Sequence, residues 1–371
     1  MPFIFTAQEK GKFEVTRKSS MLLSAVVLVV GLCAVAKPQD VLTIFNRDVL
    51  ISNLSDETVD QLHYASLYES PNENWYLTYH TGAMDAAEMP GRTTMSSDGG
   101  ETWSAWEGLT LEEGVLFHIF PTRLADDSLI FFQTWLDDLS GVPGGPTTGT
   151  AHMYRSTDDA HTWTKYDAPV TGMPYAPKLV TLWGPGIQMP DGRLLWGIMS
   201  REVPSIAGVA ETSDSGQSFQ YLASVLDDPS VGQRREPGIV RLRSGELISI
   251  LRTGTDGGNM VLTRSSDDGQ SWGDLQKLAE PGVCPQVLQL DNGAVVITYG
   301  TRYYLHAMAS WDDGHTWSQP ISLYEGQGSG YSSVQALSAN SFRVVFDESS
   351  WYTLQEGGNR IVRIELGFPS D

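Results

Sequence analysis

Five copies of one short motif divide the chain at nearly regular intervals. Each copy begins with Ser or Thr, carries Asp at its third position and ends in an aromatic residue. The aspartates are separated by 60, 56, 53 and 45 residues, and a period near fifty is the size of one propeller blade. The copies are "SSDGGETW" at 96–103, "STDDAHTW" at 156–163, "TSDSGQSF" at 212–219, "SSDDGQSW" at 265–272 and "SWDDGHTW" at 310–317.

The motif predicts a β-hairpin turn. Its Asp side chain can accept backbone N–H groups, its glycine can take a positive φ, and its terminal aromatic ring can fold back beneath the hairpin. These properties indicate a structural role. Ala160 replaces the glycine in the second copy, which predicts a slightly altered turn there.

The segments between the motifs read as short strands. Runs such as "RLLWGIM", "ELISILR" and "VVITYG" are separated by turn signals such as "PDG", "RSG" and "DNG", and residues 37–371 show no long amphipathic helical pattern. Residues 37–371 are long enough for six periods of about 55 residues. We therefore predict an all-β, six-bladed β-propeller over 37–371, with the unmarked sixth blade closed by the two ends of the chain.

Residues 1–36 have the composition of a targeting segment. Lys10, Lys12, Arg17 and Lys18 precede an apolar run from Met21 to Ala36. That run is short for a membrane span, and polar sequence follows it directly, so a cleaved signal peptide is favoured over a retained anchor. This predicts a secreted or periplasmic protein without stable membrane insertion.

Composition excludes several classes of partner. The net charge of −21 argues against binding to nucleic acid or to an anionic membrane. Cys284 is the one cysteine in residues 37–371, so that part of the chain has no intrachain disulfide. The seven histidines give no zinc pattern, and no glycine-rich phosphate loop precedes a helix, so we expect no metal and no cofactor.

The motifs and the segments between them resemble the sialidase superfamily, whose Asp-boxes have this form. "EPGIVRLRSGELISILR" at 236–252 resembles the segment in which a catalytic Glu is followed sixteen residues later by an arginine. Arg302, ten residues before Asp312, matches a further carboxylate-binding arginine. Tyr331 in "GSGYSSVQAL" matches the family's tyrosine.

The resemblance implies a specific chemistry. A sialic acid carries a carboxylate at its anomeric carbon and would repel an Asp or Glu nucleophile, so the family uses a neutral tyrosine. Tyr331 would then be the nucleophile and Glu236 its base, while Arg252 and Arg302 would hold the substrate carboxylate. The alternative is that these arginines merely form ion pairs with Glu236 or Asp347.

The general acid/base is predicted in a loop before the first motif. The resemblance favours Asp85 in "HTGAMDAAEMPGRTTMSSDGG", with Glu88 as the local rival. A solvated loop carboxylate without a catalytic role is the alternative.

The chain departs from the family in its first blade. Sialidases have an Arg-Ile-Pro motif whose arginine completes a triad around the carboxylate, whereas His63 in "QLHYASLYES" occupies that place. Arg47 is a candidate replacement, and Arg92 and Arg123 are weaker ones. We keep His63 as a substrate-binding candidate, although a neutral histidine binds a carboxylate less firmly than a guanidinium does.

These observations favour a secreted, retaining exo-glycosidase that removes terminal sialic acid or a related acidic sugar from sialylated or acidic glycans. Two alternatives stay open because of His63. One is a non-catalytic propeller that binds carbohydrate or protein, and the other is an exo-hydrolase for a different acidic sugar.

Overall fold

The computed structural model describes most of the chain after residue 40. The described residues are 41–52, 62–81, 91–105, 109, 115–116, 119–136, 149–174, 180–200, 206–226, 234–253, 258–273, 275–349 and 359–369. The chain divides into residues 1–36, which contain the predicted signal peptide and lie outside the described residues, and residues 37–371. Within the described residues, no helix is long and apolar enough to span a bilayer.

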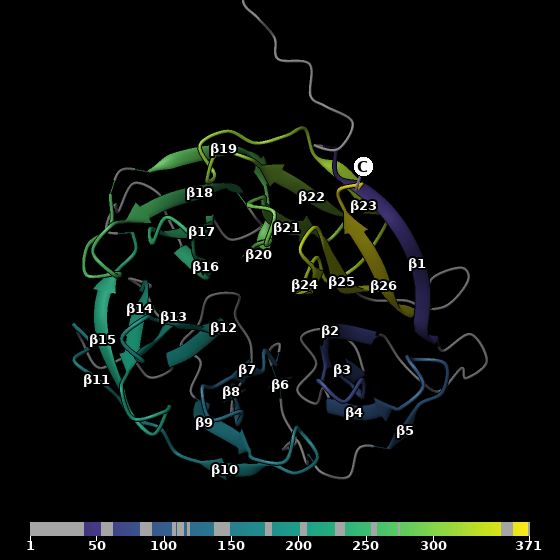
Figure 1. Ribbon diagram of the computed structural model, residues 1–371, viewed down its shortest axis with the longest axis horizontal. Helices are drawn as coiled ribbons and strands as arrows, with labels where there is room; N and C mark the ends of the chain where they lie inside the picture. The colour runs from purple at the N-terminus through teal and green to yellow at the C-terminus, as the bar shows by residue number, and fades with distance from the viewer. Residues whose placement is uncertain are drawn as a thin grey trace, which may run out of the picture. The chain divides into compact units, whose positions relative to one another are not determined.

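The strands of residues 37–371 form six sheets around a common centre, so the prediction of an all-β, six-bladed propeller is confirmed (Figure 1). From the inner strand outwards, blade 1 contains β2 (Leu62–Glu69), β3 (Trp75–Thr81), β4 (Gly91–Ser96) and β5 (Ser104–Ala105). In blade 2, β6 (Val115–Leu116) and β7 (Thr122–Arg123) both pair with β8 (Leu129–Leu136), which is followed by β9 (Gly149–Ser156) and β10 (Thr164–Tyr166). Blade 3 contains β12 (Val180–Gln188), β13 (Leu194–Ser200), β14 (Ala207–Thr212), β15 (Phe219–Ser224) and β11 (Val170–Thr171).

The remaining blades have four strands each. Blade 4 contains β16 (Arg234–Arg241), β17 (Leu247–Thr253), β18 (Gly258–Ser265) and β19 (Gln276–Pro281). Blade 5 contains β20 (Val283–Gln289), β21 (Val295–Thr301), β22 (Tyr304–Ser310) and β23 (Ile321–Glu325). Blade 6 contains β24 (Ser332–Ser338), β25 (Ser341–Glu348), β26 (Arg360–Gly367) and β1 (Thr43–Ser52).

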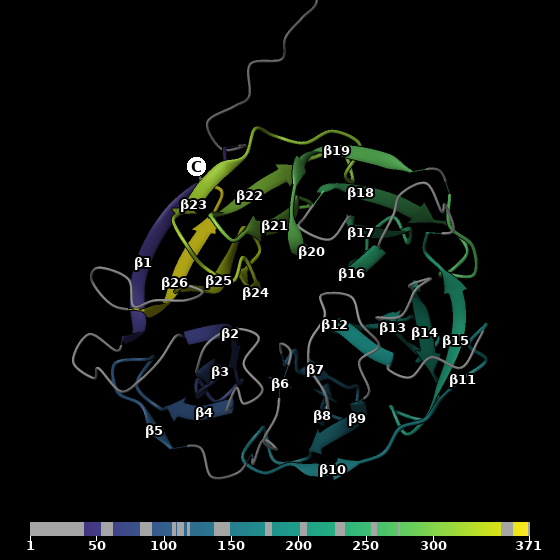
Figure 2. The same ribbon diagram turned by 180° about the vertical axis from the view of Figure 1, so that it is seen from behind.

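Blade 6 closes the ring as the sequence predicts. Its outer strand β1 comes from the beginning of the described chain and pairs antiparallel with β26 from the end, with Thr43 opposite Gly367 and Ser52 opposite Arg360 (Figure 2). The three inner strands of this blade come from the end of the chain. Because β1 pairs with β26, the outer edge of β26 is not left unpaired.

Apolar side chains fill the space between neighbouring blades. All seven residues of β13 are buried, and a cluster that contains Val296 and Ala307 of blade 5 also contains Val344 and Ile364 of blade 6. Such continuous burial is expected because each sheet packs on both faces. The blades therefore hold their inner strands rigidly around the centre.

The five repeated motifs form the predicted turns between the third and fourth strands of blades 1 to 5. In the fourth copy, Asp267 Oδ1 accepts hydrogen bonds from Ser271 N at 2.9 Å and Ser265 Oγ at 2.8 Å, while Oδ2 accepts one from Ser271 Oγ at 2.5 Å. The same three contacts recur at Asp98, Asp158, Asp214 and Asp312.

The turn with alanine keeps these hydrogen bonds, while its φ differs slightly from the 82° to 88° of the glycines at the same position in the other four copies, in line with the predicted slight alteration. Ala160 takes a φ of 69°, and its N–H donates to Ser156 Oγ at 3.0 Å, as Gly269 N–H does to Ser265 Oγ at 2.9 Å. The hydrogen bonds hold the alanine in a left-handed conformation that costs about 1 kcal/mol for a residue with a Cβ.

Candidate active site

Three inner strands have a residue other than glycine at a bulge near their first residues. In β2, β16 and β20 the pairing register shifts around a residue with positive φ, and these residues are Tyr64 at 54°, Glu236 at 57° and Cys284 at 44°. Such angles are strained for residues other than glycine and are often found at functional sites. The bulges lie at the same end of their strands, so three blades contribute to one end of the central opening.

The Glu236 carboxylate is the centre of the site. Its Oε1 accepts hydrogen bonds from Tyr331 Oη at 2.5 Å and from Arg252 Nη1 at 2.9 Å. Its Oε2 accepts a hydrogen bond from the Cys284 backbone N–H at 2.7 Å. The side chain is only 4% exposed, so these contacts from three blades fix both oxygens in a nearly dry environment.

Tyr331 immediately precedes β24 and carries its proton in the resting site. Burial raises the pKa of its phenol well above the usual value, and the negative charge of Glu236 raises it further, while Arg252 opposes this effect. The hydroxyl therefore donates its proton towards Glu236. Arg252 Nη1 lies 3.4 Å from the same hydroxyl oxygen, close to where negative charge would develop if the phenol lost its proton.

Arg252 stays charged at this position. Burial opposes its charge, but Glu236 and Tyr331 outweigh that effect and raise the pKa of the guanidinium. Its side chain is 12% exposed. The structure therefore contains the ion pair between Arg252 and Glu236, which the sequence analysis gave as the alternative to substrate binding. Both members of this pair also contact the Tyr331 hydroxyl.

Asp347 connects the loop before Tyr331 to blade 1. The carboxylate has no exposed surface. It accepts hydrogen bonds from Ser329 N at 2.7 Å, from Ser329 Oγ and from Tyr64 N at 3.2 Å. Ser329 Oγ in turn accepts a hydrogen bond from Tyr331 N at 3.2 Å. The carboxylate therefore fixes the backbone on both sides of the boundary between blades 6 and 1.

Aromatic rings enclose the Tyr331 side chain. Tyr64 lies edge-on to it with ring centroids 5.0 Å apart, and Trp183 of β12 lies edge-on at 6.3 Å. This packing accounts for the burial that raises the pKa of Tyr331. Within the described residues, no group of three or more His, Cys, Asp or Glu is placed to hold a metal ion.

The structure brings three of the six predicted site residues together, namely Tyr331, Glu236 and Arg252. Arg302 directly follows β21, and Arg252 is the last residue but one of β17. Both arginines therefore lie at the same end of the second strand of adjacent blades. The Arg302 side chain is exposed, and its carbonyl accepts a hydrogen bond from Gly328 N at 3.2 Å, beside the loop that leads to Tyr331. Its contact with a substrate stays a prediction.

His63 directly precedes Tyr64 in the sequence, and its side chain is fully buried. Its Nδ1 is 3.6 Å from Asp347 Oδ2, and neither side chain has exposed surface. A substrate carboxylate would reach His63 only after the pair became exposed, so the predicted binding role has no direct route in this conformation. Asp85 and Glu88 lie outside the described residues, and their predicted roles remain predictions.

The candidate replacements for the missing arginine lie on other strands. Arg47 lies on the outermost strand β1 and pairs with Glu348. Arg92 lies on β4 with an exposed side chain. Arg123 is bonded to Asp159 and to Tyr68, which lies towards the far end of β2 from Tyr64. None of the contacts described above for these arginines involves Tyr331.

Sequence reasoning missed Tyr64, Cys284 and Ser329. A signal for Cys284 exists, because the dipeptides Glu-Pro at 236–237 and Cys-Pro at 284–285 both end five residues before the leucine that opens the next turn. Aligning blade 4 with blade 5 therefore matches Cys284 to Glu236. Tyr64 has no proline after it, and Ser329 acts through a buried carboxylate, so neither carries such a signal.

Comparisons with known proteins support this architecture. A protein of unknown function from Dyadobacter fermentans has a TM-score of 0.71 and 19% identity, over 88% of this chain and 99% of that chain. Hadza microbial sialidase Hz136 has a TM-score of 0.66 and 16% identity, over 87% and 68%. An α-L-arabinanase from Penicillium chrysogenum, complexed with arabinobiose, has a TM-score of 0.61 and 17% identity, over 87% and 98%.

These identities show a common fold and no more. A search of curated protein sequences gave no match. The family model described as a BNR repeat-like domain matches residues 115–344, which is more than half of the chain. The chain therefore belongs to the BNR repeat-like domain family and is a sialidase-like propeller.

Proposed function

We propose that this protein is a secreted, retaining exo-glycosidase that removes terminal sialic acid or a related acidic sugar from glycans. The observation that carries the proposal is the 2.5 Å hydrogen bond from Tyr331 Oη to Glu236 Oε1, with Arg252 on the same carboxylate. A buried tyrosine of raised pKa needs a base to become nucleophilic, and Glu236 is in contact with its proton.

The first chemical step forms a glycosyl-tyrosine intermediate. Tyr331 Oη attacks the anomeric carbon as its proton passes to Glu236 Oε1, and the bond to the leaving-group oxygen breaks. Asp85 would protonate that oxygen. Arg252, with Arg302, would pair with the substrate carboxylate and hold the sugar over the nucleophile.

The second step releases the sugar with retained configuration. Asp85 takes a proton from water, the resulting hydroxide oxygen bonds to the anomeric carbon, and the bond to Tyr331 breaks. The tyrosine oxygen recovers its proton from Glu236, so both carboxyl groups return to their starting states.

Hydrolysis of a fluorogenic sialoside between pH 4 and 8 tests the proposal. Tyr331→Phe removes the nucleophilic oxygen, and we expect kcat to fall about 10³-fold or more. Tyr166→Phe is the matched control, because it removes the same group from the outer strand β10. Equal turnover by the parent and Tyr331→Phe would exclude tyrosine catalysis.

A hydrolase for another sugar is the second candidate, and the buried pairing of His63 with Asp347 favours it. Without an arginine at this place, carboxylate binding rests on fewer guanidinium groups. A panel of fluorogenic uronides and arabinosides, assayed beside the sialoside, separates the two candidates. Loss of that activity in Tyr331→Phe would assign it to the same site, and silence across the panel would favour a non-catalytic binding propeller.

Secretion belongs to the same proposal and has its own test. Cleavage after Ala36 would leave Lys37 as the first residue. The protein recovered outside the cytoplasm would then begin at Lys37 by N-terminal sequencing, whereas retention of residues 1–36 would contradict the signal-peptide hypothesis.

A further inference from the structure

A cavity extends along the inner strands β2 and β24 towards the end opposite Tyr331. Its volume is about 570 Å³, within the range of small-molecule sites. Ser66–Glu69 of β2 and Ser333–Leu337 of β24 line it, and these residues include Tyr68, Glu69 and Gln335. Arg123 of blade 2 and Pro185 of blade 3 complete the lining that matters here.

This cavity begins close to the candidate active site but has a different lining. None of Tyr331, Glu236 and Arg252 lines it, whereas Ser66 and Ser333 at its near end are each two residues along the chain from Tyr64 and Tyr331. At about 3.3 Å per residue, its far end at Glu69 lies about 16 Å from Tyr64, and its far end at Leu337 lies about 20 Å from Tyr331.

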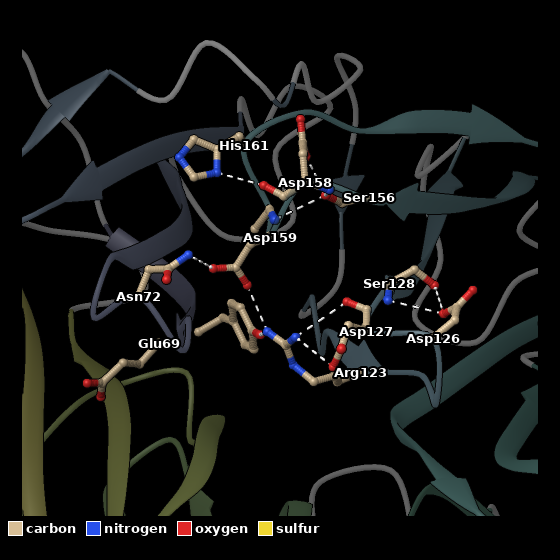
Figure 3. Close-up of polar contacts among 12 residues, drawn as sticks. Glu69, Asn72, Arg123, Asp126, Asp127, Ser128, Ser156, Asp158, Asp159 and His161 are labelled. Carbon is tan, nitrogen blue, oxygen red and sulfur yellow. Dashed lines mark hydrogen bonds and ion pairs between the residues drawn. The ribbon is translucent and has the colours of Figure 1, made fainter.

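One polar wall of the cavity is held in place by a hydrogen-bonded chain. Arg123 Nη2 donates to Tyr68 Oη at 3.0 Å and to Asp159 Oδ1 at 2.7 Å. Asn72 Nδ2 donates to the other oxygen of Asp159 at 2.9 Å, so this aspartate lies between Asn72 and Arg123 (Figure 3). The Arg123 charge is therefore balanced, and its guanidinium is fixed before any ligand arrives.

A second group of polar lining residues, Glu69 and Gln335, is fixed in the same way. Glu69 Oε2 accepts a hydrogen bond from Arg343 Nη1 at 2.7 Å, and the Arg343 guanidinium lies 4.4 Å from the centre of the Trp75 ring. Gln335 Oε1 accepts a hydrogen bond from Glu69 N at 3.3 Å. Because these groups are already ordered, a ligand would bind without the entropy loss of arranging them.

The lining favours a ligand with many hydroxyl groups and no net charge. Apolar surfaces of Phe120, Pro121 and Pro185 lie among the polar groups, which suits the C–H faces of a sugar ring. Glu73 adds negative charge, while the charges of Glu69 and Arg123 are balanced by Arg343 and Asp159. An anion is further disfavoured by the net charge of −21.

We propose that this cavity is a second carbohydrate site, which binds neutral sugar units rather than the acidic sugar assigned to the Tyr331 end. Exposed Pro71, Glu73, Ala336 and Leu337 leave its rim open to solvent. The site uses none of the residues assigned to hydrolysis, so it stands independently of the proposed function.

Calorimetric titration tests this site with lactose, maltotriose and diacetylchitobiose as probes and spermidine as a cationic comparison. We expect at least one neutral oligosaccharide to bind the parent and Tyr331→Phe with the same Kd. Ala336→Trp places an indole at an exposed lining position and should weaken that binding at least fivefold. Val49→Trp, at an exposed position of the outer strand β1, is the matched control and should bind as the parent does.

The outcomes that overturn the site are equally specific. Binding of no neutral oligosaccharide, binding of spermidine alone, loss of binding in Tyr331→Phe, or less than fivefold weakening by Ala336→Trp would each reject it. Leu337→Glu gives a second variant on the same wall if Ala336→Trp lowers the melting temperature. Sialoside turnover by the parent is measured separately, so failure here is distinguishable from failure of the proposed hydrolase activity.

Discussion

The outer turns and the inner bulges both recur from blade to blade. The turns keep their backbone conformation and their side chains, whereas the bulges keep only their backbone conformation. The turns around Asp98, Asp158, Asp214, Asp267 and Asp312 repeat backbone and side chain together. The bulges repeat a positive φ while the side chain changes from Tyr64 to Glu236 to Cys284. Each turn must satisfy its own N–H groups, so the motif keeps the same residue types at its hydrogen-bonding positions in blades 1 to 5.

The inner bulges meet a different neighbour in each blade. Glu236 receives the Tyr331 hydroxyl, Tyr64 packs against the same ring, and Cys284 supplies only its backbone N–H to Glu236 in the contacts described above. A repeated backbone with varied side chains is therefore the feature that builds an asymmetric site on a nearly symmetric ring. This contrast predicts that substitutions at the inner site change kcat, whereas substitutions in the outer turns change stability.

The largest effect is expected at the inner aspartate. Asp347→Asn replaces an acceptor oxygen with a donor next to the N–H groups of Ser329 and Tyr64, so one donor faces another. The loop before Tyr331 should shift, and we expect kcat to fall about 10- to 100-fold with KM within about threefold. Steady-state kinetics on the substrate that the parent hydrolyses measures this split.

A purely structural role for Asp347 would give another result. The melting temperature would fall while kcat of the folded fraction stayed within threefold of the parent. Active-site titration beside a thermal melt distinguishes the two cases, because it counts the competent molecules directly.

The repeats made most of the fold predictable. Spacing of the motif aspartates gave the blade size, and the absence of a motif near the ends indicated that the termini share blade 6, as β1 and β26 do. Local turn chemistry was predictable because its hydrogen bonds join residues at most four apart. The slight change in φ at Ala160 was predictable too, because a residue with a Cβ replaces glycine there while the turn hydrogen bond is kept.

The site was predictable only where a stretch of sequence resembles a known family. Tyr331, Glu236 and Arg252 were predicted together because "EPGIVRLRSGELISILR" and "GSGYSSVQAL" resemble sialidase segments, and their catalytic roles stay predictions. Contacts made through a backbone N–H, as at Cys284, or through a carboxylate 283 residues from its partner, as between Asp347 and Tyr64, leave no local pattern. The burial of His63 beside Asp347 is of the same kind.

An intermediate effect is expected at the outer aspartate, on stability and not on catalysis. Hydrogen bonds from the Ser271 side chain, then from the Ser271 backbone and Ser265, lower the pKa of Asp267 from 3.8 to about 2. A lowered pKa means that the ionised carboxylate stabilises the fold above pH 4, and that this stabilisation is lost as the pH falls to about 2. Asp267→Asn should lower the melting temperature by about 1–3 °C at pH 7.

The pH dependence identifies the cause of that loss. The difference between parent and Asp267→Asn should shrink as the pH falls from 4 to 2, with kcat at neutral pH unchanged. Asp268→Asn removes the same charge one residue along the turn and serves as the control. An equal loss in both variants would point to net charge rather than to the turn hydrogen bonds.

The smallest effect is expected at Cys284, where the comparison between turns and bulges assigns no catalytic role to the side chain. Cys284 holds Glu236 through its backbone N–H at 2.7 Å, and Cys284→Ala keeps that group and the Cβ. The variant loses Sγ and its 3.3 Å contact with Gln286, so we expect stability to fall by about 1 kcal/mol and kcat to stay within about threefold. A much larger loss of kcat at unchanged stability would mean that the thiol itself acts in the site. Each side chain at an inner bulge would then have its own chemical task. This would include Cys284, for which the described contacts give a role to the backbone N–H.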